Sequence, residues 1–138
     1  MKKLHLISVI IGLAIFFGNF QTVFAGDLPD GVVSALKSGN AKELAKYFNS
    51  NIDLTIIDKQ DIYSKTQAEI ILKEFFGKNI PSNFTVMHQG GKEGSKYVIG
   101  NLVTSTGTYR VSLFLKLQGV TQVIQQLRIE SGNEWVMA

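Results

Sequence analysis

The sequence predicts an α+β fold in which helices pack on one face of a curved antiparallel sheet. Two observations carry this prediction. The helical hydrophobic patterns lie before Pro81, and the chain after Pro81 is a series of strand patterns separated by glycine turns. Segregation of helices and strands along one chain is typical of the α+β class. The chain lacks cysteine, so an ordinary apolar core rather than disulfides must stabilise it.

The N-terminal segment has the pattern of a cleavable signal peptide over residues 1–25. Two lysines precede an apolar run from Leu6 to Phe17, and Val23-Phe24-Ala25 matches an A-x-A-like cleavage site. The run is short against the roughly 20 residues needed to span a bilayer, which favours cleavage over a membrane anchor. We therefore expect an exported protein, periplasmic or secreted, without stable membrane insertion after cleavage.

Residues 26–138 are expected to form a single domain. A chain of this length buries roughly 65% of its unfolded surface, which is enough for one core but not for two. Loss of the two N-terminal lysines leaves a nearly balanced charge, and arginine occurs only at Arg110 and Arg128. Nucleic-acid binders instead concentrate basic residues on one face. The composition thus argues against nucleic acid and anionic membranes as partners.

Two short helices are expected between Leu28 and Phe48. Apolar residues recur at helical spacing up to Gly39, which ends the first helix. The second helix starts at the capping-box-like segment Asn40–Glu43. The polar segment Asn49–Asn51 is expected to end it as a turn.

A strand and a longer helix follow. Residues Ile52–Ile57 alternate as in a strand, and Asp58–Asp61 is expected to be a turn or loop. Ser64–Gln67 is a capping box, and the helix that it opens is expected to end at Gly77. One face of this helix is apolar: Ala68, Ile71, Leu72, Phe75 and Phe76.

Four strands of an antiparallel meander complete the prediction. They are expected at Asn83–Gln89, Ser95–Ser105, Thr108–Gln118 and Thr121–Glu130. Residues 90–94 are predicted to form a hairpin loop rather than a phosphate-binding loop, because they join two strands. Alternation in the third of these strands predicts one buried and one largely solvated sheet face.

The order of elements resembles the nuclear transport factor two-like (cystatin-like) superfamily, which includes ketosteroid isomerases and polyketide cyclases. Five segments also resemble a family of exported Bacteroidetes proteins defined as a domain of unknown function: Leu36–Ala41, Tyr63–Glu69, Lys73–Phe76, His88–Gly90 and Gly107–Val111. This resemblance implies the fold and export, and it supplies no catalytic residue.

The superfamily resemblance implies a cone-shaped pocket between the sheet and the helices. Candidate pocket residues are polar or aromatic side chains beside the apolar strand positions or ahead of the long helix: Tyr63, His88, Tyr97, Asn101, Tyr109 and Gln125. A buried, unpaired amide costs about 1 to 3 kcal/mol, so Asn101 and Gln125 must bond each other, a water or a ligand. The structural alternatives are a core-edge histidine at His88 and a helix staple at Tyr63.

The opposite sheet face is predicted to carry Val98, Leu102, Phe114 and Ile124 among polar residues. An exposed apolar patch is typical of an interface, so we expect a homodimer there. Scattered surface hydrophobic residues are the alternative.

These patterns favour a non-enzymatic ligand-binding or protein-interaction module of the bacterial cell envelope, with a small apolar ligand as one partner. We assign no catalytic residue, cofactor or metal site, because after cleavage His88 has no second histidine or cysteine to join it. One alternative is an isomerase- or cyclase-like enzyme with His88 or Asp53 as the base. Asp53 faces outward, however, if Ile52 and Leu54 face inward. A structural dimer subunit is the other alternative.

Overall fold

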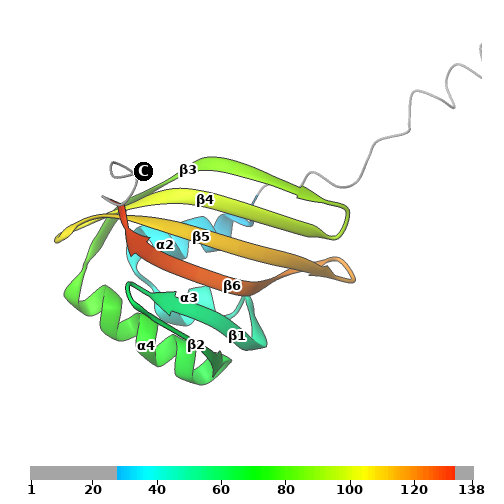
Figure 1. Cartoon of the computed structure of the whole chain (residues 1–138), viewed down its shortest axis with the longest axis horizontal. Coiled ribbons are helices and arrows are strands. Elements are labelled where there is room, and N and C mark those ends of the chain that lie inside the picture. Colours follow the sequence, from blue (N-terminus) through cyan, green and yellow to red (C-terminus); the bar gives the residue numbers. More distant parts are fainter. Residues whose placement is uncertain (1–27, 133–138) are drawn as a thin grey trace, which may run out of the picture.

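The computed structural model describes residues 28–132, which form helices packed against one six-stranded sheet (Figure 1). The helices of this region are α2 (Asp30–Ser38), α3 (Ala41–Ala45) and α4 (Lys65–Lys78). The strands are β1 (Phe48–Ile56), β2 (Lys59–Ser64), β3 (Pro81–Lys92), β4 (Ser95–Thr104), β5 (Gly107–Gln118) and β6 (Thr121–Ser131). The predicted signal peptide lies outside the described residues. Within residues 28–132, no helix is long and apolar enough to cross a membrane.

The strands follow the order β2-β1-β6-β5-β4-β3 in an open sheet. Strands β1 and β6 run parallel, and the other neighbours are antiparallel, so the sheet is mixed rather than wholly antiparallel. Helices α2 and α3 lie behind the sheet in Figure 1, and α4 runs beside β2. The predicted α+β class and the meander of β3 to β6 are confirmed.

The core lies between the helices and one face of the sheet. On β4 and β5, the side chains that point into it are almost completely buried: Val98, Leu102, Val111, Leu113 and Leu115. Burial of such a side chain stabilises a protein by about 1.5 to 3 kcal/mol. Gly100 lies among them because the ring of Phe84 occupies the space beside it, and an added Cβ would lie 2.6 Å from that ring.

The helix termini follow the sequence signals closely. Gly39 takes a left-handed φ of 68° and ends α2. The side chains of Asn40 and Ser64 each accept a hydrogen bond from the backbone N–H three residues on, at 3.1 and 3.2 Å. The prediction for Gly77 is wrong, because α4 continues for another residue and Asn79 caps it.

The first hairpin differs from the prediction. Strand β1 begins at Phe48, so the residues expected to end a helix and form a turn belong to the sheet. Most of the predicted loop Asp58–Asp61 belongs to β2, which pairs with β1. The turn between β1 and β2 has no glycine to mark it in the sequence. Ile57 takes a left-handed φ of 57°, a conformation that glycine usually adopts. Strand β3 likewise continues to Lys92, through most of the predicted loop.

Candidate functional site

A pocket of about 330 Å³ lies between α4 and the β1–β2 hairpin. This volume is at the lower end of the roughly 300 to 1,000 Å³ typical of small-molecule sites. The lining residues come from three neighbouring elements and the end of α4: Leu54, Ile56, Lys59, Tyr63, Ile71, Glu74, Phe75, Lys78 and Asn79. The four from α4 recur at i, i+3, i+4 and i+7, so one helix face forms a wall of the pocket.

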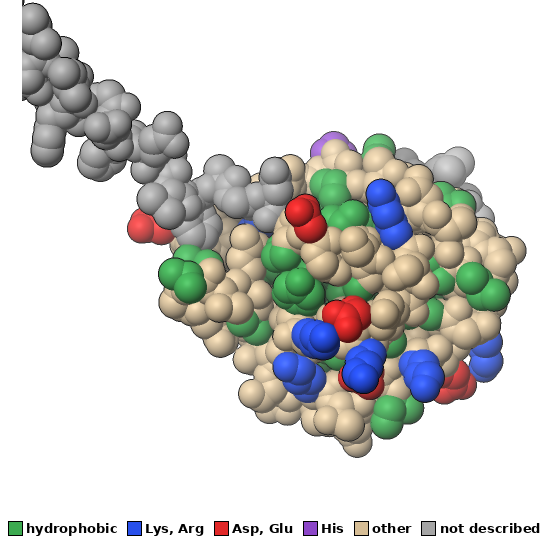
Figure 2. Space-filling model, turned by 180° about the vertical axis from the view of Figure 1, so that it is seen from behind, with side chains coloured by type: hydrophobic (Ala, Val, Ile, Leu, Met, Phe, Trp, Pro, Cys, Tyr) green, Lys and Arg blue, Asp and Glu red, His purple; other side chains and the backbone are tan. Residues whose placement is uncertain are grey.

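The pocket has an apolar floor and a charged rim. Leu54 is fully buried and Phe75 is 7% exposed, whereas the lysines and Glu74 are exposed. Lys78 Nζ lies 3.2 Å from Glu74 Oε1, and both side chains are largely exposed, so this ion pair adds little stability. Within the described part of the chain, the side chain of Lys59 makes no hydrogen bond or ion pair. Figure 2 shows basic side chains gathered on the side of the molecule that carries the helices.

Asn79 fastens the end of α4 to the β4–β5 hairpin. Its Oδ1 accepts hydrogen bonds from Thr106 Oγ1 at 2.5 Å and from Tyr109 Oη at 3.0 Å. Its Nδ2 donates to the carbonyl oxygen of Phe75 at 2.9 Å, and the ring of Phe75 packs edge-on against Tyr109 with centroids 5.3 Å apart. A primary amide has two N–H donors, so this side chain keeps one for a further acceptor.

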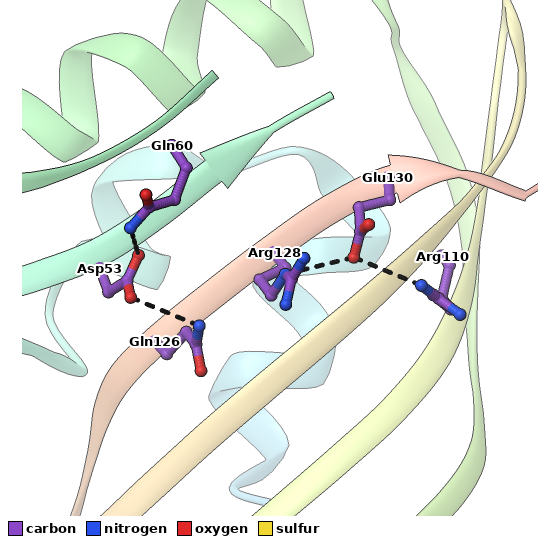
Figure 3. Close-up of polar contacts among 6 residues, drawn as sticks. All are labelled: Asp53, Gln60, Arg110, Gln126, Arg128 and Glu130. Carbon is purple, nitrogen blue, oxygen red and sulfur yellow. Dashed lines mark hydrogen bonds and ion pairs between the residues drawn. The ribbon is translucent and has the colours of Figure 1, made fainter. Parts of the chain in front are cut away.

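A polar cluster lies on the opposite, outer face of the sheet (Figure 3). Asp53 on β1 accepts hydrogen bonds from Gln60 Nε2 at 2.7 Å and from Gln126 Nε2 at 3.4 Å. The three side chains come from three adjacent strands. Asp53 therefore faces outward, as the alternation of β1 predicts, and two amides hold its carboxylate.

Glu130 forms the second half of this outer cluster, between two arginines (Figure 3). Its Oε1 lies 3.4 Å from Arg110 Nη2 and 3.3 Å from Arg128 Nε. The Glu130 side chain is only 14% exposed, and that of Arg110 is 23% exposed. Together with Asp53, the two acids and two arginines leave no net charge on this part of the outer face.

The predicted pocket residues are divided between the two faces. Tyr63 lines the pocket, and Tyr109 lies behind its Asn79 end. Gln125 occupies an irregularity of β6, where the pairing with β5 shifts register, and its Oε1 accepts from Asn49 Nδ2 at 3.2 Å. A structural neighbour thus satisfies this amide.

His88, Tyr97 and Asn101 lie on the outer face instead. Because Val98 and Leu102 are fully buried, the odd-numbered residues of β4 must point the other way. On β3, the register shifts between Val86 and His88. His88 therefore points to the opposite face from Phe84 and Val86, although a regular strand would place all three on one face. Its side chain is exposed. His88, Tyr97 and Asn101 therefore do not line the pocket.

The predicted outer patch is wrong for the same reason. Val98, Leu102 and Ile124 are 0% exposed in the core, and only Phe114 of the set lies on the outer face, half-buried. Odd- and even-numbered positions of β4 both carry apolar side chains, and Gly100 stands at one of the inward positions. The sequence of β4 therefore shows no clear alternation of apolar and polar residues. The outer face instead presents Tyr97, which is 49% exposed and pairs with Phe114 across the β4–β5 ladder.

Sequence reasoning missed the rim and the Asn79 end of the pocket. Glu74 and Lys78 follow Ile71 at helical spacing and could have been found from α4 alone. Lys59 could be placed only once β2 was known to be a strand. Within residues 28–132, no group of three His, Cys, Asp or Glu side chains could hold a metal ion.

Residues 29–130 match a family described as a domain of unknown function, DUF4783. The chain belongs to the DUF4783 family. A DUF4783 structure from Bacteroides ovatus is 38% identical, with a TM-score of 0.74, and the match covers 80% of this chain and 100% of that one. A DUF4783 structure from Bacteroides uniformis is also 38% identical, with a TM-score of 0.73, and the match covers 78% of this chain and 100% of that one. No curated protein matches this DUF4783 chain.

More distant structures share only the fold of this DUF4783 domain. The putative calcium/calmodulin dependent protein kinase II association domain from Xanthomonas campestris is 15% identical, with a TM-score of 0.59, and the match covers 83% of this chain and 94% of that one. A protein named Rd1NTF2_05 is 13% identical, with a TM-score of 0.61, and the match covers 72% of this chain and 90% of that one. The family and the nuclear transport factor two-like fold predicted from the sequence are therefore confirmed.

Proposed function

We propose that this DUF4783 domain is a non-enzymatic ligand-binding module of the bacterial cell envelope, and that its ligand occupies the pocket beside α4. The pocket itself carries the proposal, because an apolar floor with a few polar groups is the usual make-up of a small-molecule site. The export pattern of residues 1–25 supports the location.

The positions of the titratable groups support binding rather than catalysis. A general base must lie within hydrogen-bond reach of the proton that it abstracts. His88 and Asp53, the candidate bases, are on the sheet face opposite the pocket. The carboxylate that does line the pocket, Glu74, is exposed and paired with Lys78.

Two adjacent isoleucines of α4 provide a matched test. Ile71 lines the pocket, whereas Ile70 is 60% exposed and is not part of the lining. In ¹⁵N NMR titrations with octanol and octanoate, we expect saturable shifts of amides at 59–63 and 71–79. Ile71→Trp should abolish these shifts by filling the pocket, and Ile70→Trp should leave them intact. If neither probe gives saturable shifts at these amides, the binding proposal fails.

We also propose that a second copy of the chain covers the outer sheet face. Tyr97, Ile99 and Phe114 are neighbours there, and the two acids and two arginines of the outer cluster add no net repulsion between two copies. Six strands at roughly 4.8 Å span about 29 Å, which is wide enough for the roughly 800 Å² per partner of a stable interface.

Sedimentation velocity checks this self-association. We expect a dimer that Tyr97→Asp dissociates, because the substitution puts an unpaired charge into the interface. Val120→Asp, at a position 98% exposed in the β5–β6 turn, is the control and should remain dimeric. A wild-type chain that stays monomeric at high micromolar concentration would contradict the proposed dimer.

A further inference from the structure

We infer that the pocket takes an amphipathic anion, a carboxylate with an apolar body, and that the acid group lies at the Asn79 end. The inference rests on the proposed binding function and adds the chemical class and the orientation of the ligand. It follows from which polar groups of the pocket are already engaged and where the free ones lie.

Three groups of the pocket lining have a donor that no described residue engages. Lys59 Nζ has no partner among the described residues, and neither has the hydroxyl of Tyr63. Asn79 keeps one amide N–H, because its other interactions use Oδ1 and a single N–H. Two acceptor atoms of the lining are engaged: Glu74 Oε1 lies 3.2 Å from Lys78 Nζ, and Asn79 Oδ1 accepts from two hydroxyls. A ligand that supplies acceptors therefore fits this lining.

The charge of the lining favours an anion. Lys59 and Lys78 stand against the single carboxylate of Glu74, which leaves one positive charge. Asp61 lies between Lys59 and Tyr63 on β2, but it is not a lining residue, and its Oδ1 accepts from the backbone N–H of Ile62 at 2.8 Å. Hydrogen bonds between a cationic donor and a carboxylate are about twice as strong as neutral ones.

Strand register places the free cation and the free amide at the same end. Lys59 pairs with Ile56, and Ile56 pairs in turn with Ile129 of β6. Ile129 pairs with Val111 of β5, which is two residues from Tyr109. The Tyr109 hydroxyl donates to Asn79 Oδ1, so Asn79 lies near the same end of the sheet as Lys59. The acid group of the ligand would thus lie between Lys59 and Asn79.

The apolar body of the ligand would extend from there toward Tyr63. This residue pairs with Ile52, four positions along β1 from Ile56, which is about 13 Å at 3.3 Å per residue. Leu54 and Ile71 line the pocket and supply apolar contact. The Tyr63 ring can close the far end, with its hydroxyl toward water.

Three probes of one chain length test this assignment: octanoate, octanol and octylammonium, measured by calorimetry at neutral pH. We expect octanoate to bind roughly tenfold tighter than octanol, and octylammonium to bind most weakly. Lys59→Met should weaken octanoate binding roughly two- to fivefold and leave octanol binding unchanged, whereas Lys59→Arg should restore octanoate binding. Lys73→Met removes an exposed lysine of α4 outside the lining and should change neither.

The outcomes separate the two proposals. Equal or tighter binding of octanol overturns the anion assignment but leaves the ligand-binding proposal standing. An octanoate affinity that Lys59→Met does not alter overturns the placement of the acid group. Absence of saturable binding for all three probes overturns both proposals.

Discussion

Replacement of Asn79 by alanine should destabilise the domain more than any other single amide truncation at its surface. The side chain makes three hydrogen bonds, to Thr106, Tyr109 and the Phe75 carbonyl. At about 1 kcal/mol each, the gross loss is about 3 kcal/mol. The two hydroxyls also lie 2.9 Å apart and can bond each other, so we expect a net loss of about 2 kcal/mol.

That loss should lower the Tm by roughly 8 to 16 °C, since 1 kcal/mol shifts a domain of this size by roughly 4 to 8 °C. Guanidinium unfolding followed by circular dichroism measures the loss in free energy of unfolding. Asn83→Ala, at an exposed position of β3, is the control. A double-mutant cycle with Tyr109→Phe should give a coupling of about 1 kcal/mol. An Asn79→Ala loss below about 0.5 kcal/mol, the usual scale of an inert surface change, would refute the role of this side chain as a fastener.

Three further substitutions test the packing of the sheet and helix by the same unfolding assay. Gly100→Ala should cost about 1 to 3 kcal/mol, because the added Cβ would lie 2.6 Å from the Phe84 ring and 2.7 Å from the Thr85 carbonyl oxygen. An unchanged unfolding midpoint would show that this ring does not occupy the space. Gly77→Ala has open space inside α4 and should stabilise by about 0.5 to 1 kcal/mol; a loss would mean that α4 ends earlier. Ile57→Gly should relieve about 1 to 3 kcal/mol of backbone strain, less about 0.5 to 1 kcal/mol for glycine entropy, and a large destabilisation would contradict the positive φ.

The helices were predictable because their signals are local. The N-cap side chains of Asn40 and Ser64, and the left-handed Gly39, act within a few residues of their own positions. The apolar face of α4 repeats at one fixed period. Each of these features could therefore be read from a short window of sequence.

The sheet faces were less predictable because parity depends on distant partners. Strand β4 carries apolar side chains on both faces, and packing against residues from other elements, such as Phe84 beside Gly100, decides which face is inward. The register shift after Val86 turns His88 outward, and no residue type announces such a shift. Both effects moved predicted pocket residues to the outer face.

The pocket could be foreseen only in part. Tyr63 was a candidate, but Lys59 and Asn79 were not, because each depends on an element that the sequence conceals. The β1–β2 turn has Ile57 where glycine is expected, so β2 has the pattern of a loop. Asn79 gains its role from hydroxyls on a hairpin far along the chain.

A crystal structure of the domain soaked with octanoate is the most direct test of the account. We predict that the carboxylate lies within hydrogen-bond distance of Lys59 Nζ and Asn79 Nδ2, with the alkyl chain along Leu54 and Ile71 toward Tyr63. An octanoate molecule with its carboxylate at the Tyr63 end, or one bound on the outer face of the sheet with the pocket left empty, would contradict it.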